Sequence, residues 1–166
     1  MNGILPSITI LGSLALVALA ASVRRSGFSA DALPIQRAAR AAAVTVAAQS
    51  IHFTEELATG FHVRFPELFG LGPMPLSFFV AFNVAWIGIW ALSAHGLTSR
   101  NRLGLFPLWF LALAGIANGF AHPAFALITG GYFPGLVTSP VVAVLAFLLL
   151  RRLVEATVQL TPRRER

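Results

Sequence analysis

The sequence predicts an all-α fold, a polytopic helix bundle that crosses a membrane five times. Of its 166 residues, 57% are hydrophobic, and the mean hydropathy is +0.78. Only 11% of the residues are charged, whereas soluble domains carry about 25%. The apolar residues gather in five runs, and arginines bracket these runs. Together these observations indicate an integral membrane protein with a single domain over residues 1–166.

The first run, residues 4–23, is long enough to cross a hydrocarbon core of about 30 Å at about 1.5 Å per residue. Its positive charges, Arg24 and Arg25, follow the apolar stretch, whereas those of a signal peptide precede it. We therefore expect a retained first helix with its N-terminus outside.

Four further runs complete the predicted bundle. The second is rich in alanine and weakly hydrophobic, and the last is short, although Arg151 and Arg152 can extend it by snorkelling. The four helices are expected over residues 38–61, 76–95, 104–127 and 137–150.

The arginines predict the orientation of the bundle. In the five-helix arrangement, only Arg64 of the 12 basic residues falls on the outer side. Because cytoplasmic loops carry an excess of basic residues, the C-terminal tail, residues 151–166, is expected in the cytoplasm. The basic residues on this side are Arg24, Arg25, Arg37, Arg40, Arg100, Arg102, Arg151, Arg152, Arg163, Arg164 and Arg166.

Composition also limits the classes of function. The pI near 11.7 does not indicate nucleic-acid binding, because the arginines flank apolar runs and form no patch of their own. No cysteine is present, which excludes a disulfide framework and a thiolate metal site. The absence of lysine and the many alanines are typical of a high-GC bacterial genome, so we expect a multi-pass protein of the bacterial inner (cytoplasmic) membrane.

The second run carries a polar group, "HFTEE" at residues 52–56. On a helix, where successive residues turn by about 100°, His52, Glu55 and Glu56 project to one side. A carboxylate near the centre of a membrane helix costs about 2.5–3.5 kcal/mol, so this side is expected to face a partner helix or a wet cavity. Glu56 lies about 24 Å along the helix from Arg40, in the outer half of the membrane. The alternative is a solvated position at the outer interface.

The fourth run supplies two facing groups. Asn118 and His122 are four residues apart and share one helix face. Measured from the inner end of the run, they lie about 24 and 30 Å along the helix. Asn118 is therefore expected level with Glu56, and His122 nearer the outer surface.

Glycine and proline predict two further features. Gly115 and Gly119 allow a close approach between helices. Pro134 and Gly135 suit the central positions of a type II turn, which would fold Tyr132 over the outer mouth of the bundle. An aromatic-belt position suits Tyr132 equally well. Weaker candidates for the site are Asn83, His62 and His95.

Three motifs, "HFTEE", "NGFAH" and "YFPG", follow one another in this order. In combination they resemble the HXXEE family of small bacterial integral membrane proteins, which is described by HxxEE, NxxxH and YxPG motifs. The resemblance extends over about residues 45–150. It implies an integral membrane enzyme of undetermined activity and supplies no substrate.

Imidazoles and carboxylates are ligands suited to Zn, Fe or Mn. In a low dielectric, Glu55 and Glu56 cannot both stay charged without a partner, and no arginine is expected level with them. Either a divalent cation pairs them, or at least one of them is protonated.

The first hypothesis is a metal-dependent membrane hydrolase. His52, Glu56 and His122 bind the ion in this hypothesis, and the second glutamate, Glu55, acts as general base, although the two glutamates could exchange these roles. Asn118 or Tyr132 stabilises the developing oxyanion. The reaction is the hydrolysis of an amphipathic, lipid-like substrate from the outer leaflet. The expected catalytic residues are Glu55, Glu56, Asn118 and Tyr132.

Two alternatives remain open. In one, a metal-free acid/base pair isomerises, hydrates or cyclises a lipid-like substrate. In the other, the cluster serves a proton- or ion-coupled carrier, although the inner half of the bundle has few polar residues. The expected partners are membrane lipids and an amphipathic small molecule, with no nucleic acid. Because the bundle is small for enclosing a pocket alone, a homodimer is a further alternative.

Overall fold

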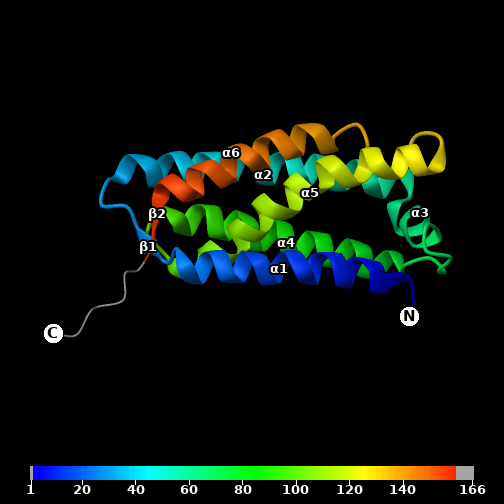
Figure 1. Cartoon of the computed structure of the whole chain (residues 1–166), viewed down its shortest axis with the longest axis horizontal. Helices are drawn as coiled ribbons and strands as arrows, with labels where there is room; N and C mark the ends of the chain where they lie inside the picture. The colour runs from blue at the N-terminus through cyan, green and yellow to red at the C-terminus, as the bar shows by residue number, and fades with distance from the viewer. Residues whose placement is uncertain (1, 160–166) are drawn as a thin grey trace.

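Residues 2–159, the part that the computed structural model describes, form six α-helices (Figure 1). The helical fold class predicted from the sequence is confirmed, apart from one short antiparallel ladder between β1 (Gly27–Phe28) and β2 (Thr157–Val158). The helices are α1 (Leu5–Arg24), α2 (Ala32–Thr59), α3 (Phe61–Glu67), α4 (Leu76–Leu97), α5 (Leu105–Thr129) and α6 (Ser139–Ala156), with short 3-10 turns at η1 (Asn2–Ile4) and η2 (Arg102–Gly104).

Three helical segments within residues 2–159 are long and apolar enough to cross a membrane. Within them, windows of 18 residues have mean hydropathies of 1.9 (in Leu5–Arg24), 1.8 (in Leu76–Leu97) and 1.7 (in Arg102–Thr129). The chain is therefore a membrane protein. The sequence also predicts that α2 and α6 cross, and both are less apolar because α2 carries alanines and polar side chains, while α6 includes Arg151 and Arg152.

Several boundaries differ from those expected. Helix α2 begins at Ala32, before the expected residue 38, because Asp31 holds an extended conformation ahead of the first turn. Gly60 ends α2 with a left-handed φ of 81°, and the expected outer loop, residues 62–75, begins inside α3. Helix α6 continues through the arginines to Ala156. Of the predicted tail, residues 160–166, with Arg163, Arg164 and Arg166, lie outside the described residues.

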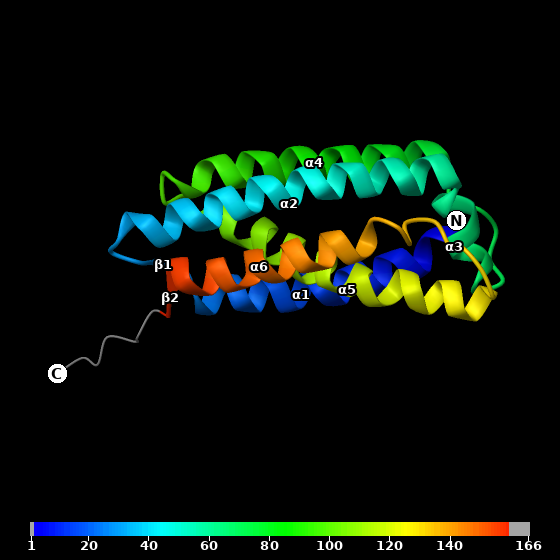
Figure 2. The ribbon, with the colours of Figure 1, turned by 90° about the horizontal axis from the view of Figure 1, so that it is seen from above.

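Apart from the short α3, the helices run roughly along one axis, which α5 crosses obliquely (Figures 1 and 2). α2 and α6 lie on one side of the bundle, and α1 and α4 lie on the other. α5 crosses between these pairs and packs against α1, α4 and α6, while α2 packs against α4 and α6. The crossing carries the C-terminal half of α5 to the α2–α6 side, which is where the polar motifs of α2 and α5 meet.

Small residues allow α6 to approach both of its neighbours. A Cβ at Gly115 would lie 2.7 Å from the Ala146 Cβ, and one at Gly119 would overlap Ala143. The expected close approach at these two glycines is therefore confirmed, and α6 is the partner. On α2, Ala38 and Ala42 are fully buried in the apolar core, so the alanines of this helix are packing residues.

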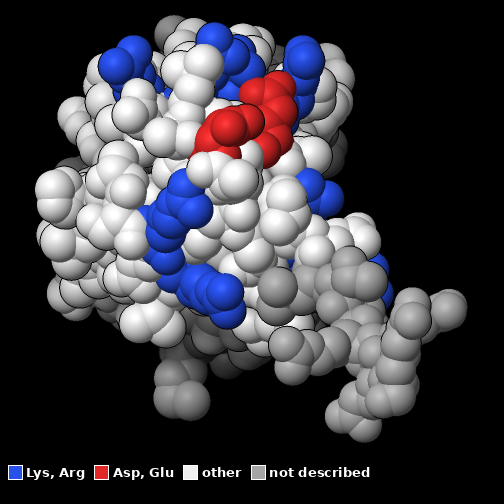
Figure 3. All heavy atoms as spheres, turned by 90° about the vertical axis from the view of Figure 1, so that its left-hand side faces the viewer, with Lys and Arg blue, Asp and Glu red and all other residues white. Residues whose placement is uncertain are grey.

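The two ends of the bundle differ in charge. One end is formed by the C-termini of α1, α4 and α6 and by the N-termini of α2 and α5, and arginine side chains gather there (Figure 3). Among the described arginines, Arg64 of α3 belongs to the opposite end. We call these the arginine end and the α3 end.

The glycines provide a test of the α5–α6 contact. Gly119→Ala should lower the free energy of unfolding by about 1–3 kcal/mol, because its Cβ has no space beside Ala143. Gly88→Ala in α4, where nothing lies within 4 Å of the added carbon, should instead raise it by up to about 1 kcal/mol. Thermal unfolding in one detergent measures both variants. Equal melting temperatures for the two variants would contradict the packing.

Candidate metal centre

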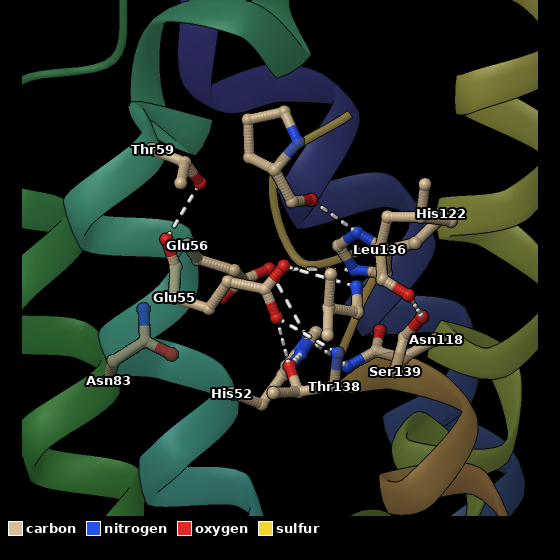
Figure 4. Close-up of polar contacts among 12 residues, drawn as sticks. His52, Glu55, Glu56, Thr59, Asn83, Asn118, His122, Leu136, Thr138 and Ser139 are labelled. Atoms are coloured by element: carbon tan, nitrogen blue, oxygen red, sulfur yellow. Dashed lines mark hydrogen bonds and ion pairs between the residues drawn. The ribbon is translucent and has the colours of Figure 1, made fainter. Parts of the chain in front are cut away.

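Three side chains from two helices converge near the α3 end of the bundle (Figure 4). On α2, His52 and Glu56 are one turn apart, and His122 of α5 faces them. The Glu56 Oε1 atom lies 3.5 Å from the His52 Nε2 atom and 3.5 Å from the His122 Nε2 atom. All three residues are buried, and their ligand atoms lie within 4.8 Å of one another, so the group could hold a metal ion.

His52 is oriented by a relay to a second carboxylate. Its Nδ1 atom lies 2.7 Å from the Thr138 hydroxyl, which itself donates to Glu55 Oε2 at 2.5 Å. Because the hydroxyl gives its proton to the carboxylate, it accepts the proton of His52 Nδ1. We therefore assign the Nδ1–H tautomer from the hydrogen-bond network, and the Nε2 lone pair points into the cluster.

His122 is oriented by the backbone of the loop between α5 and α6. Its Nδ1 atom lies 2.6 Å from the Pro134 carbonyl oxygen, which can only accept. Nδ1 therefore carries the proton, and Nε2 again offers a lone pair to the cluster. Metal-binding histidines are held in this way, with the second ring N–H donated to a carbonyl or to a group linked to a carboxylate.

Glu55 points away from Glu56 and binds the start of α6. Its carboxylate accepts four hydrogen bonds, from the Tyr132 hydroxyl, the Thr138 hydroxyl and the backbone N–H groups of Val137 and Thr138. Thr138 is the N-cap of α6, a position where free N–H groups and the helix dipole favour an anion. Glu55 is thus placed to position the loop and His52, and it contributes no atom to the His52–Glu56–His122 group.

Tyr132 lies in the loop beyond the end of α5 and donates to Glu55 Oε1 at 2.7 Å. Partial burial raises the pKa of its phenol above the ordinary value of 10.0, and the hydrogen bond to the carboxylate raises that pKa further. The phenol therefore stays neutral and remains a donor through the physiological range. In this arrangement the hydroxyl is committed to Glu55.

The turn after Tyr132 brings the backbone against both imidazoles. The Leu136 N–H donates to the Phe133 carbonyl at 3.0 Å, and Gly135 has a φ of 86°. Pro134 and Gly135 therefore occupy the central positions of a type II turn, as predicted. A Cβ at Gly135 would lie 2.5 Å from His122 Cε1 and 2.8 Å from His52 Cε1. The glycine is required both by the turn and by the packing of the two rings.

Asn118 lies one turn deeper than the sequence predicts. Its Nδ2 atom is 3.3 Å from His52 Nε2, so Asn118 is level with His52, and His122 is level with Glu56. Asn83 of α4 has its amide bonded to the Phe79 carbonyl at 2.9 Å. His62 stacks on Phe79 outside the cluster, with ring centroids 6.1 Å apart. His95 is exposed near the arginine end of α4.

A cavity of about 360 Å³ adjoins the cluster. Glu56, Asn118 and His122 line one part of it, and the remaining lining is mainly apolar. Gln49, one turn before His52 on α2, also lines the cavity. The cluster is therefore reached from an oily compartment inside the bundle.

Sequence reasoning missed three contributions from the α5–α6 loop. These are the Thr138 hydroxyl, the Pro134 carbonyl and the contact of Gly135 with both rings. The "YFPG" turn was recognisable, but a lone threonine three residues later carries no signal of its own. Only the structure shows that the loop returns over α2 and that Thr138 links His52 to Glu55.

Comparisons of the chain with known protein families, with curated proteins and with solved structures gave no match.

The two spacings to Glu56 fit a divalent cation, and all three ligand atoms lie within 4.8 Å of one another. At 3.5 Å, the contacts of Glu56 are longer than the range of about 2.7–3.2 Å for an N–H···O hydrogen bond. Two ligand atoms about 2.0–2.1 Å from a tetrahedral zinc ion are about 3.4 Å apart. With both Nδ1 atoms protonated, two nitrogen lone pairs and a carboxylate oxygen face one another. The Asn118 amide, 3.3 Å from His52 Nε2, can satisfy one of these lone pairs, and a cation or a proton between the groups would satisfy the others.

Gly135→Ala should disrupt the cluster, because the added carbon meets both imidazole rings and the φ is left-handed. We expect a loss of about 2–4 kcal/mol in the free energy of unfolding. Gly130→Ala is the matched control, since its φ is 70° and nothing lies within 4 Å of the added carbon. It should cost about 1 kcal/mol from the backbone alone. Thermal unfolding compares the two, and equal costs would show that the rings do not pack on Gly135.

Tyr132 can be titrated alone, because it is the only tyrosine of the chain. Its tyrosinate absorbance should appear with a midpoint above pH 10, and in Glu55→Gln the midpoint should move back toward 10.0. The folded state favours the neutral phenol, so its contribution to stability is present below pH 10 and is lost as the pH rises through the raised pKa. A midpoint that is the same in both proteins would argue against the Tyr132–Glu55 bond.

Proposed function

We propose that the chain is an integral membrane enzyme in which His52, Glu56 and His122 bind a divalent cation, Zn, Fe or Mn. The proposed reaction is the hydrolysis of an amphipathic, lipid-like substrate. One observation carries this proposal: two imidazoles, each with its Nδ1 already donated to a protein acceptor, aim their Nε2 lone pairs at one buried carboxylate oxygen. Three such groups without a proton between them form a ligand set for a metal.

The proposal includes the predicted membrane topology. Five spans with the N-terminus outside place the arginine end in the cytoplasm of a bacterium, as the excess of basic residues favours. The cluster then belongs to the outer half of the inner membrane. The lower hydropathy of α2 is explained in this arrangement by the contacts that bury its polar side chains in protein.

The proposed roles of the residues follow from their contacts. A bound cation would polarise a substrate carbonyl and lower the pKa of a water molecule. His52, Glu56 and His122 fix the ion, and Asn118 offers an amide donor beside it for a developing oxyanion. Glu55, with Thr138 and Tyr132, acts as a positioning group that holds His52 and the loop. The base proposed from sequence, Glu55, is replaced in this scheme by Glu56, the carboxylate that lies within the group.

A metal-free acid/base enzyme is the second candidate. The approach of Glu56 to the two imidazoles favours it as well. A proton held by Glu56 would satisfy one imidazole lone pair, and Glu56 would then act as acid toward a substrate in the cavity. Both candidates agree with the resemblance to the HXXEE family, because its three motifs supply the cluster, Asn118 and the "YFPG" turn. Membership of that family is part of the proposal.

Elemental analysis of the purified protein separates the candidates. We expect a stoichiometric divalent metal in the native chain and its loss in His52→Ala, His122→Ala and Glu56→Gln. His95→Ala is the control, because this exposed imidazole lies outside the cluster. A native protein that stays metal-free after incubation with Zn, Fe and Mn would instead select the acid/base candidate.

Thr138→Val tests the relay behind His52. It keeps every ligand atom but removes the acceptor of the Nδ1 proton. Loss of such a partner lowers metal affinity by about 10–100-fold. Competition with a chelator measures the affinity, and unchanged affinity in this variant would show that the relay does not support the ligand.

A further inference from the structure

The cavity beside the cluster extends along α4. It is lined by Phe78 near the start of this helix and by Trp90 further toward the arginine end. These residues are 12 positions apart, which corresponds to about 18 Å of helix. Phe82, Trp86 and Phe110 line the length between them. The compartment is therefore elongated and aromatic, with the cluster near its outer part and tryptophans at its inner part.

The residues that line the cavity suit a ligand with one hydrocarbon chain and no charge. Glu56 is the only charged side chain in the lining, and none of the described arginines lines the cavity. A volume of about 360 Å³ is at the lower end of the range of about 300–1,000 Å³ for ligand pockets. That size suits a single hydrocarbon chain. The lining supplies no arginine to an anionic head group, so only the proposed cation would attract one.

The cavity opens sideways between α1 and α4. Ile8 of α1 and Phe78 of α4 both line it, and they are 58% and 37% exposed. Gly12, on the same wall as Ile8, has nothing within 4 Å of the position of a Cβ. In a membrane protein this opening faces acyl chains, so a substrate can pass from the bilayer into the bundle without crossing water.

Three amides line the cavity, Gln49, Asn83 and Asn118, and the first and last of these belong to the two helices that carry the cluster. Gln49 is 7% exposed and lines the cavity, and Asn118 lies beside His52. Both present neutral donors and acceptors, which match a carbonyl or hydroxyl group and not a phosphate. They flank the position at which a head group would meet Glu56 and His122.

We propose that this cavity binds the hydrocarbon chain of a neutral, single-chain lipid ester, such as a monoacylglycerol. The ester passes between α1 and α4, and its carbonyl group lies against the His52–Glu56–His122 cluster. Trp86 and Trp90 close the inner end of the cavity and so set the longest chain that fits. This inference rests on the proposed function for the orientation of the ester, whereas binding of the chain does not require catalysis.

Fluorescence quenching tests the proposal, because Trp86 and Trp90 line the cavity and Trp109 does not. The full chain is placed in lipid nanodiscs and titrated with monoacylglycerols brominated at the end of the acyl chain. We expect saturable quenching, which is lost in Trp86→Phe/Trp90→Phe and kept in Trp109→Phe. A lysophosphatidic acid with the same brominated chain should bind more weakly. Equal or tighter binding of that anion would overturn the neutral head group.

Two glycine variants provide the matched control. Gly12→Phe fills the opening and should abolish saturable quenching, whereas Gly88→Phe, which adds the same ring to open space on α4 outside the cavity, should leave it unchanged. Trp90→Ala should shift the tightest binding to a longer chain. Quenching that only follows the amount of ester in the bilayer, or that is alike in both glycine variants, would overturn the proposal.

Glu56→Gln separates this inference from the proposed function. It should keep the saturable quenching while it loses metal and turnover. If metal and turnover fail in the native protein but chain binding remains, the proposed hydrolysis is wrong and the chain site stands. If metal is bound but quenching is never saturable, the chain site is wrong and the metal centre stands.

Discussion

The burial of unshared electron pairs is the constraint on which this structure depends. Two imidazole nitrogens and a carboxylate oxygen meet away from water, where each unpaired polar group is costly. The loop between α5 and α6 controls this meeting, because the Pro134 carbonyl and the Thr138 hydroxyl determine which nitrogen of each ring carries the proton. Glu55 holds this loop through the Val137 and Thr138 N–H groups, whereas the adjacent Glu56 faces the two imidazoles.

The rest of the bundle brings these parts together. Alanines on α2 and glycines on α5 let both helices pack closely against α6, and the rings of His52 and His122 meet edge to face beside Gly135, with centroids 4.8 Å apart. α5 crosses the bundle so that its N-terminal half packs in the apolar core and its C-terminal half reaches the cluster. The space between α1 and α4 is filled by side chains only in part, which leaves the cavity beside the ligands.

The sequence predicted the helical class, the convergence of "HFTEE" with "NGFAH" and the type II turn, because these follow from hydropathy, helical period and the backbone preferences of Pro134 and Gly135. It did not predict that Glu55 turns away from Glu56. Helical spacing gives the direction of a Cβ atom, but the choice of partner depends on where the loop before α6 returns. The depth of Asn118 was wrong by one turn, because distances measured along separate helices ignore the oblique course of α5.

Helix α1 is fastened at both of its ends. Near its C-terminus, the Arg25 guanidinium donates to the Val154 and Thr157 carbonyls, and β1 pairs with β2 just beyond. Near its N-terminus, Gly3 lies so close to Gly72 that no side chain would fit between them. Contacts at both ends restrain α1 from moving away from the bundle as a rigid body. In the proposed route for the lipid, the opening between α1 and α4 therefore keeps its width, and the rotation of side chains along it would control entry.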